Sequence, residues 1–223
     1  MTADVDELDA LRRRVLNVVG HALRTPVTTL CGLADELARS DDPAAQHALR
    51  DAVHRNAEIV ETLLDDLLVA AGVSTVLPTD PPRSVSIAAA AGDAWKAVGM
   101  SSTLDVVGDA DATVLAPVAC VVKPLERMLD NAARYGSGPV QVRVTSDGST
   151  VAIAVASHGG RPTDEEVTHA LEPFYRGEHA VMTAPGLGVG LPVARALARH
   201  AGGDVALVVD GDEVVATLRL AAP

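Results

Sequence analysis

The chain has 223 residues, of which 48% are hydrophobic, so it has enough apolar material for one large core or two smaller ones and is not expected to be disordered. Its formal net charge is −12, from 18 Lys and Arg against 30 Asp and Glu, so the basic surface that a nucleic-acid backbone requires is not expected. Aromatic residues make up only 2% of the chain, which also weighs against stacking on nucleic-acid bases.

The two cysteines predict no disulfide framework and no zinc site. Cys31 and Cys120 lie far apart and lack metal-ligand spacing, and we expect both to be small buried residues. No apolar run approaches the ~20 residues that cross a bilayer, and the amino-terminal segment MTADVDELDALRRR lacks the pattern of a signal peptide. These features predict a cytoplasmic chain with no direct membrane segment.

Residues 5–72 predict a hairpin of two long helices that turns at SDDP, residues 40–43. Apolar residues recur at spacings of three and four along both helices. The first stripe comprises Leu8, Leu11, Val15, Val18, Ala22, Leu30, Leu33 and Leu37, and the second comprises Val53, Val60, Leu63, Leu67 and Ala71. A lone hairpin cannot enclose such stripes, so we expect a homodimer that forms a four-helix bundle.

Residues 72–84, GVSTVLPTDPPRS, change in composition to Pro, Ser and Thr, which is typical of a linker. We therefore place a helical domain at 1–74, a linker at 75–84 and a second domain at 85–223. In the second domain we predict strands at 84–87, 103–107, 139–145, 150–156, 204–209 and 213–220, and helices at 88–99, 123–135, 164–171 and 190–201. The predicted fold class is α+β, with a helical hairpin followed by an α/β sandwich whose helices cover one face of a mixed sheet.

The segment NVVGHALRTPVTTL, residues 17–30, contains a specific motif on the first helix. His21 lies on the flank of the apolar seam, and Pro26 should bend the helix. A single histidine on a helix is usually only a surface residue, and a single proline often only a kink. Together, however, His-x-Leu-Arg-Thr-Pro resembles the phospho-acceptor box of sensor histidine kinases, H-E-L-R-T-P. The resemblance implies that His21 takes a phosphoryl group from ATP and passes it to an aspartate of a response regulator.

The resemblance assigns Arg24 and Thr25 to the catalytic set together with His21. Thr25 matches the polar position with which the family orients a hydrolytic water. Ala22 replaces the acidic residue that acts as general base in the family, and a positioned base typically contributes ~10²–10⁴-fold to the rate.

The segment PLERMLDNAARYGSG, residues 124–138, resembles the asparagine box of histidine kinases and of the wider Bergerat ATPase group. An asparagine near a helix end is more often only a cap, but the resemblance makes Asn131 a Mg²⁺ ligand, because its oxygen suits that ion beside phosphates. Arg134 stands where the family has lysine and could neutralise phosphate charge, and the resemblance also assigns Tyr135, the next residue, to the nucleotide site. Arg127 stands where the family has an earlier asparagine.

Two further segments resemble nucleotide-binding boxes. LEPFYRGEH, residues 171–179, matches the phenylalanine box and contains Phe174. GLGVGLPVARALARHAGG, residues 186–203, then begins with Gly186, Gly188 and Gly190, which we expect to open a helix whose free N–H groups cradle phosphates. No strand precedes these glycines, so a nucleotide lid is a better interpretation than a dinucleotide fingerprint.

The first glycine box, D-x-G-x-G in the family, aligns with residues 154–166. Ser157 then takes the place of the aspartate that accepts a hydrogen bond from the adenine amino group, and Gly159 that of the first glycine. Replacing a charged acceptor with a hydroxyl costs ~1.5–3 kcal/mol, which corresponds to roughly ten- to hundredfold in affinity.

Three functions remain open from the sequence. The first is an active kinase that uses ATP and Mg²⁺, with a response regulator receiver domain and a second copy as partners. The second is a phosphotransfer protein that relays phosphate without binding ATP, and the third is a non-catalytic pseudokinase that scaffolds a partner; Ala22 and Ser157 favour these two. The stimulus would arrive through an upstream sensor protein, or the chain is the cytoplasmic part of a longer protein.

Overall fold

The computed structural model describes residues 2–73, 76–100, 103–109, 111–159, 162–177, 180–181 and 186–223. Side chains are described from residue 16 onward within these ranges, with the exception of residue 18. The chain divides into two compact units, Met1–Leu67 and Leu68–Pro223. No described helix combines the length and the apolar character needed to cross a membrane.

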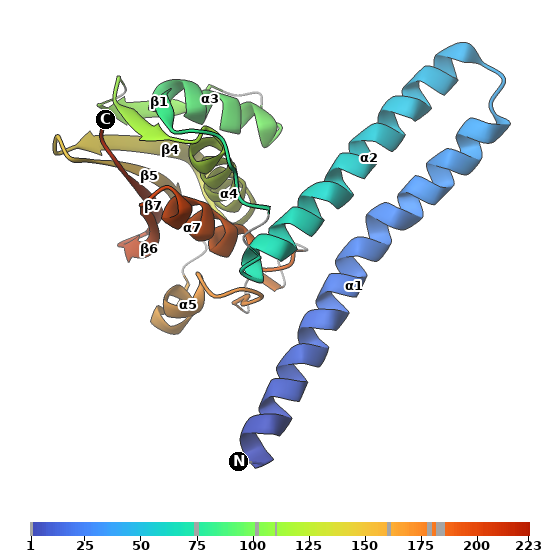
Figure 1. The fold of residues 1–223 in the computed structure, drawn as a ribbon, viewed down its shortest axis with the longest axis horizontal. Coiled ribbons are helices and arrows are strands. Elements are labelled where there is room, and N and C mark those ends of the chain that lie inside the picture. The colour runs from blue at the N-terminus through green and yellow to red at the C-terminus, as the bar shows by residue number, and fades with distance from the viewer. Residues whose placement is uncertain are drawn as a thin grey trace. The chain divides into compact units, whose positions relative to one another are not determined.

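The first unit contains the predicted helical hairpin (Figure 1). Helix α1 spans Thr2–Arg39 and helix α2 spans Pro43–Ala70. The turn between them is held by Gln46, whose Nε2 donates to the Ser40 carbonyl across 2.6 Å, and by Asp42, whose Oδ1 accepts from the Ala44 amide at 3.1 Å. Pro43 can begin α2 because the first residue of a helix needs no N–H bond. The predicted turn at residues 40–43 is therefore confirmed.

The second unit is an α/β sandwich, as predicted. Its main sheet has five strands in the order β2-β4-β5-β7-β6, in which β2 and β4 are parallel and the other neighbours are antiparallel. These strands are β2 (Asp105–Gly108), β4 (Ser137–Ser146), β5 (Thr150–His158), β6 (Asp204–Asp210) and β7 (Glu213–Ala221). A separate antiparallel pair consists of β1 (Arg83–Ser86) and β3 (Thr113–Ala116). The helices are α3 (Ile87–Ala97), α4 (Ala119–Tyr135), α5 (Asp164–His169) and α7 (Gly190–His200).

Two features of the second unit differ from the sequence prediction. Strand β3 was not predicted, because four residues that pair with a strand about thirty positions away show little local pattern. Helix α4 begins at Ala119, earlier than the predicted residue 123, since Pro124 lies inside the helix and not at its start.

Cys120 is buried as expected, but Cys31 is exposed because it lies beside the apolar stripe of α1 and not within it.

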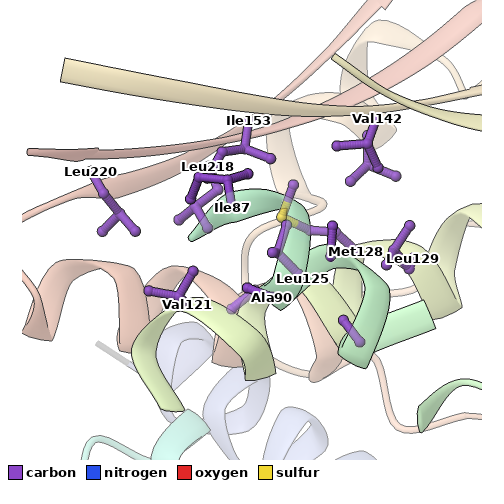
Figure 2. Packing of buried hydrophobic residues seen from close by; sticks show 14 of the residues in the cluster. Ile87, Ala90, Val121, Leu125, Met128, Leu129, Val142, Ile153, Leu218 and Leu220 are labelled. Atoms are coloured by element: carbon purple, nitrogen blue, oxygen red, sulfur yellow. The ribbon is translucent and has the colours of Figure 1, made fainter. Parts of the chain in front are cut away.

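The core lies between the sheet and the helices on one of its faces (Figure 2). Alternate residues of the strands point toward the helices, as expected for a sheet with one covered face. Helix α4 presents apolar residues to the sheet at spacings of three and four. The fully buried members labelled in the figure are Ile87, Val121, Leu125, Leu129, Val142, Ile153 and Leu218, each with an exposed fraction of 0%. Burial of each large side chain contributes about 1.5–3 kcal/mol, so α4 is held rigidly against the sheet.

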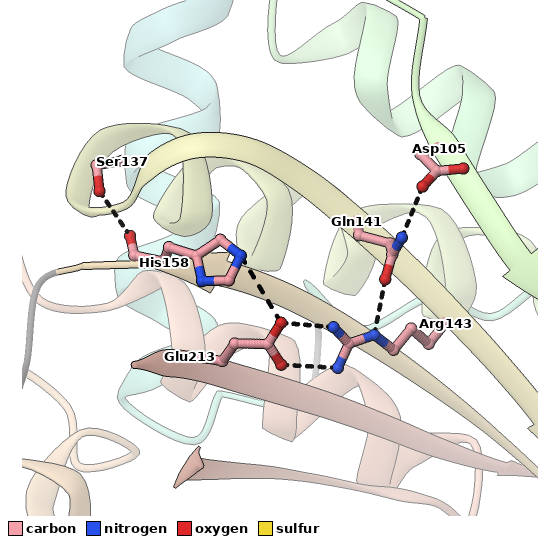
Figure 3. A network of polar contacts seen from close by, with 6 residues as sticks. All are labelled: Asp105, Ser137, Gln141, Arg143, His158 and Glu213. Carbon is pink, nitrogen blue, oxygen red and sulfur yellow. Dashed lines mark hydrogen bonds and ion pairs between the residues drawn. The ribbon is translucent and has the colours of Figure 1, made fainter. Parts of the chain in front are cut away.

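The opposite face of the sheet carries a polar network (Figure 3). Arg143 donates from Nη1 and Nη2 to the two carboxylate oxygens of Glu213 at 2.8 and 2.5 Å. Gln141 accepts from Arg143 Nε at 2.8 Å and donates to Asp105 at 2.6 Å. The network therefore connects β2, β4 and β7, and the hydrogen bonds from Arg143 lower the pKa of Glu213.

Candidate functional site

His21 is exposed on α1, as are Arg24 and Thr25 of the same motif. Pro26 is buried within the helix and has no N–H, so it cannot donate to the Ala22 carbonyl one turn earlier. The imidazole of His21 is therefore open to solvent beside an irregularity in helical hydrogen bonding. A ring nitrogen in this position can act as a nucleophile toward an incoming group.

The residue after the histidine supplies no acid–base chemistry. Ala22 is partly buried, and its methyl group can neither accept a proton nor orient the His21 ring. The backbone carbonyl of Thr25 accepts a hydrogen bond from Thr29 Oγ1 at 3.0 Å. The hydroxyl of Thr25 takes no part in this bond.

In the second unit, α4 carries the residues of the predicted asparagine box. Arg127, Asn131 and Arg134 are spaced i, i+4 and i+7, so they lie on one face of the helix. Asn131 is partly buried. Arg134 Nε lies 2.7 Å from both carboxylate oxygens of Asp130, so its charge is partly neutralised by a neighbour on the helix.

The glycine-rich segment lies alongside α4. A Cβ atom placed on Gly186 would lie 3.8 Å from the Tyr135 hydroxyl, and one placed on Gly190 would lie 4.0 Å from Arg127 Cδ. Residues 186–190 therefore run antiparallel to the helix, from its carboxyl end toward its middle. Asn131 lies midway along the helix between these two contacts.

The phenylalanine box joins this glycine segment through the backbone. The amide of Phe174 donates to the carbonyl of Gly188 at 2.9 Å. Gly188 has a φ of 69°, and a Cβ atom there would lie only 2.9 Å from Arg176 Cγ and 3.1 Å from the Phe174 carbonyl carbon. Only glycine fits this position without displacing the neighbouring backbone. Phe174 itself has a φ of 68°, an unusual conformation for a bulky residue that the surrounding contacts maintain.

Ser157, predicted to face adenine, lies at the carboxyl end of α4. Its side chain on β5 is only 7% exposed. A Cβ atom on Gly136, the residue that ends α4, would lie 2.7 Å from Ser157 Cβ and 3.1 Å from its hydroxyl. The two segments can approach this closely only because residue 136 has no side chain.

Gly159 follows directly after β5 with a φ of 80°. A Cβ atom on Gly159 would lie 2.6 Å from the hydroxyl of Ser137, which donates to the His158 carbonyl at 3.3 Å (Figure 3). A side chain is therefore disfavoured at this position by both backbone conformation and space. Residues 160–161, the rest of the predicted glycine box, lie outside the described residues.

Two known domain families match separate parts of the chain. Residues 11–71 match the His Kinase A (phospho-acceptor) domain, and residues 122–222 match the family described as histidine kinase-, DNA gyrase B-, and HSP90-like ATPase. The chain belongs to the two-component histidine kinase family. The first match includes His21, which lies in the first unit. The second match includes the segments that resemble nucleotide boxes, which lie in the second unit.

Individual histidine kinases are also similar to this chain in sequence or in structure. The signal transduction histidine-protein kinase AfsQ2 of Streptomyces coelicolor is 25% identical over 221 residues, which cover 91% of this chain and 40% of AfsQ2. The sensor protein KdpD of Mycobacterium tuberculosis is 30% identical over 96% of this chain and 26% of its own length. The chain thus spans less than half of either relative. The solved structure of the Acinetobacter baumannii histidine kinase AdeS has the same fold, with a TM-score of 0.58, 20% identity and coverage of 91% of this chain and 98% of AdeS.

The residues of this histidine kinase chain fit a bound nucleotide with a metal ion. No side chain caps the start of α7 at Val189, so the first N–H groups of that helix point toward the glycine segment. In this set the side-chain oxygen of Asn131 is the atom that could hold a metal ion. Among the described residues no group of three or more His, Cys, Asp or Glu side chains is placed to hold a metal. A metal here would therefore depend on phosphate oxygens and water for its remaining ligands.

One neighbour of a predicted site residue was missed from the sequence. Asp130 was not predicted as part of the site, although its spacing of four residues from Arg134 on a helix is a recognised signal for an ion pair. The predicted lid between the phenylalanine and glycine boxes includes residues 178–179 and 182–185, which lie outside the described residues.

Proposed function

We propose that this chain is a catalytically active histidine kinase. In this proposal ATP and Mg²⁺ bind the second unit, His21 is phosphorylated, and the phosphoryl group passes to an aspartate in the receiver domain of a response regulator. The observation that carries the proposal is the approach of the glycine segment to α4 at two points, with Gly186 beside Tyr135 and Gly190 beside Arg127. Asn131 is held between them.

Each predicted site residue has a role in this proposal. Asn131 holds the metal ion, and the N–H groups at the start of α7 hold phosphate oxygens. Arg134 adds positive charge, while the hydroxyl of Ser157 accepts a hydrogen bond from adenine. The proposed nucleotide-binding set is completed by Tyr135, Gly159, Phe174, Gly186, Gly188 and Gly190. Bound ATP supplies the γ-phosphoryl group.

His21 supplies the nucleophile, an imidazole nitrogen with a free lone pair. With Ala22 beside it, no carboxylate on the next residue accepts the ring proton, so we expect phosphorylation to be slower than in a variant with an acid at position 22. Arg24 and Thr25 lie exposed on the same helix and complete the catalytic set.

We also propose that the chain is a homodimer through its hairpin. Among the side chains described within residues 16–67, only Pro26 and Asp66 are buried. Large apolar side chains with exposed fractions of 45–62% are Leu16, Val27, Ile59 and Leu64. A second hairpin would cover them in a four-helix bundle. The proposed domain limits are 1–74, 75–84 and 85–223, and the proposed location is the cytoplasm.

Ala22 and Ser157 point toward phosphate relay without ATP or scaffolding by a pseudokinase, but the family matches do not specifically favour either function. The two alternatives therefore remain outcomes of the experiment. An upstream sensor protein is a further proposed partner.

The first experiment combines calorimetric titration with a phosphorylation assay. The full chain is titrated with a non-hydrolysable ATP analogue and Mg²⁺, and is then incubated with γ-labelled ATP. We expect micromolar binding and an acid-labile label that His21→Gln abolishes. His54→Gln is the matched control, because His54 is an exposed histidine on the same hairpin, with its side chain 81% exposed.

The outcomes separate the functions. Binding with a label that His21→Gln removes and His54→Gln retains supports the kinase. A label that survives His21→Gln would remove that residue from the mechanism. If the chain fails to bind nucleotide, acceptance of phosphate from a phosphorylated receiver domain would establish the relay function, and no acceptance would favour the scaffolding pseudokinase.

A further inference from the structure

Helix α4 presents two cations on the face that carries Asn131. Arg127 lies one turn before Asn131, and Arg134 lies about one turn after it. The two arginines differ in their surroundings. The Arg134 side chain is 49% exposed and lies in the last turn of α4, whereas Arg127 is partly buried and its stem reaches the glycine segment.

The stem of Arg127 lies beside the start of α7. A Cβ atom on Gly190 would lie 4.0 Å from Arg127 Cδ, which is van der Waals contact, and Gly190 is the first residue of α7. The guanidinium begins at Nε, the atom bonded directly to Cδ. It is therefore within reach of an anion held by the uncapped N–H groups of that helix.

The chemistry of arginine suits this position. Its guanidinium remains charged at all physiological pH values and offers several donors in one plane, a geometry that matches phosphate oxygens. At a site where Asn131 is the only proposed metal ligand, a fixed cation at the start of α7 would neutralise part of the phosphate charge without a metal ion.

We propose that Arg127 binds the phosphate chain of the nucleotide at the start of α7 and thereby makes nucleotide binding less dependent on Mg²⁺. This inference rests on the proposed function of the same site. It makes Arg127 a phosphate-binding residue in addition to the set predicted from the sequence.

Calorimetric titration of the full chain tests the proposal. The wild type, Arg127→Gln and Arg127→Lys are each titrated with the non-hydrolysable ATP analogue and with adenosine, in Mg²⁺ and in EDTA. The matched control is Arg219→Gln, which removes the same charge from an exposed position on β7. Circular dichroism establishes that each variant is folded.

We expect Arg127→Gln to lose roughly ten- to hundredfold in affinity for the ATP analogue, as for the loss of a charge-assisted hydrogen bond. Its affinity for adenosine should equal that of the wild type, because adenosine has no phosphate. The loss should be larger in EDTA than in Mg²⁺, and Arg127→Lys should retain part of the binding. Arg219→Gln should bind as the wild type does.

Two results would overturn this inference and leave the proposed function intact. The first is an Arg127→Gln variant that binds the ATP analogue as tightly as Arg219→Gln does in both conditions. The second is an equal loss for adenosine and for the ATP analogue, which would assign Arg127 to the structure of the site. A wild-type chain that binds no nucleotide in either condition would overturn the proposed function as well.

Discussion

The amide of Phe174 donates to the carbonyl of Gly188 across 2.9 Å, which ties the phenylalanine box directly to the glycine segment. Both residues have φ values near 70°. Two residues in the left-handed region, facing one another through a backbone hydrogen bond, make this junction sensitive to side-chain size. The junction also sets where the glycine segment lies along α4. We therefore expect a change at this junction to weaken nucleotide binding.

Replacement of Gly188 by alanine should therefore be costly. The left-handed conformation alone costs an alanine roughly 1–2 kcal/mol, and at position 188 a Cβ atom would also approach the Phe174 carbonyl carbon to 3.1 Å. Gly202→Ala is the matched control, since Gly202 has a φ of 79° but no atom within 4 Å of the added carbon. We expect urea unfolding to show a larger loss of stability for Gly188→Ala than for Gly202→Ala, together with weaker nucleotide binding. Equal losses would mean that backbone conformation alone matters at position 188.

Release of Arg134 from its ion pair should strengthen nucleotide binding. Asp130→Asn removes the carboxylate that competes with phosphate for the Arg134 guanidinium, and an exposed pair of this kind contributes about 0.2–1 kcal/mol. We expect the affinity for an ATP analogue to rise by up to about fivefold in calorimetric titration. Asp93→Asn breaks a comparable pair with Lys96 on α3 and should leave the affinity unchanged. An unchanged affinity in Asp130→Asn would show that Arg134 does not contact the phosphates.

Asp204 should make stability depend on pH in the acid range. The hydrogen bond from Arg195 Nε at 2.8 Å is the main cause that lowers the pKa of Asp204 to about 2. Since the folded pKa lies below the unfolded value of about 3.9, the stabilisation is present above pH 4 and is lost as the pH falls from about 4 to about 2.

The test compares the wild type with Asp204→Asn in urea unfolding between pH 7 and pH 3. Because the Asp204 side chain is 48% exposed, we expect a difference of only about 1 kcal/mol at pH 7. The difference should shrink below pH 4. A difference that stays constant down to pH 3 would contradict the assigned cause.

A charge placed on the apolar surface of the hairpin should disrupt the proposed dimer. Leu64 on α2 is 51% exposed, and its burial against a second copy would be incompatible with a glutamate. We expect Leu64→Glu to sediment as a monomer under conditions in which the wild type is a dimer. Leu115→Glu, on β3, is the matched control with an exposed fraction of 50% and should remain dimeric. The hairpin surface would be excluded as the interface if both variants behaved alike.

Much of the fold could be predicted because its signals are local. The spacing of apolar residues predicted α1 and α2, and Ser40–Pro43 predicted the turn between them. Alternation of apolar residues likewise predicted β4, β5 and β7. The four-residue strand β3 escaped prediction because its stability depends on β1, a partner about thirty residues earlier in the chain.

The sequence by itself determined the motifs and their order, because a helical period or a six-residue acceptor box such as that around His21 is complete within a short segment. Only the tertiary structure decided which residues meet: Arg127 with Gly190, Ser157 with Gly136, and Phe174 with Gly188. These contacts join segments up to sixty-three positions apart, and they arise from the packing of α4 against α7 and the sheet. This packing depends on the sizes and orientations of all the buried side chains together. It therefore cannot be predicted from any single segment of the sequence.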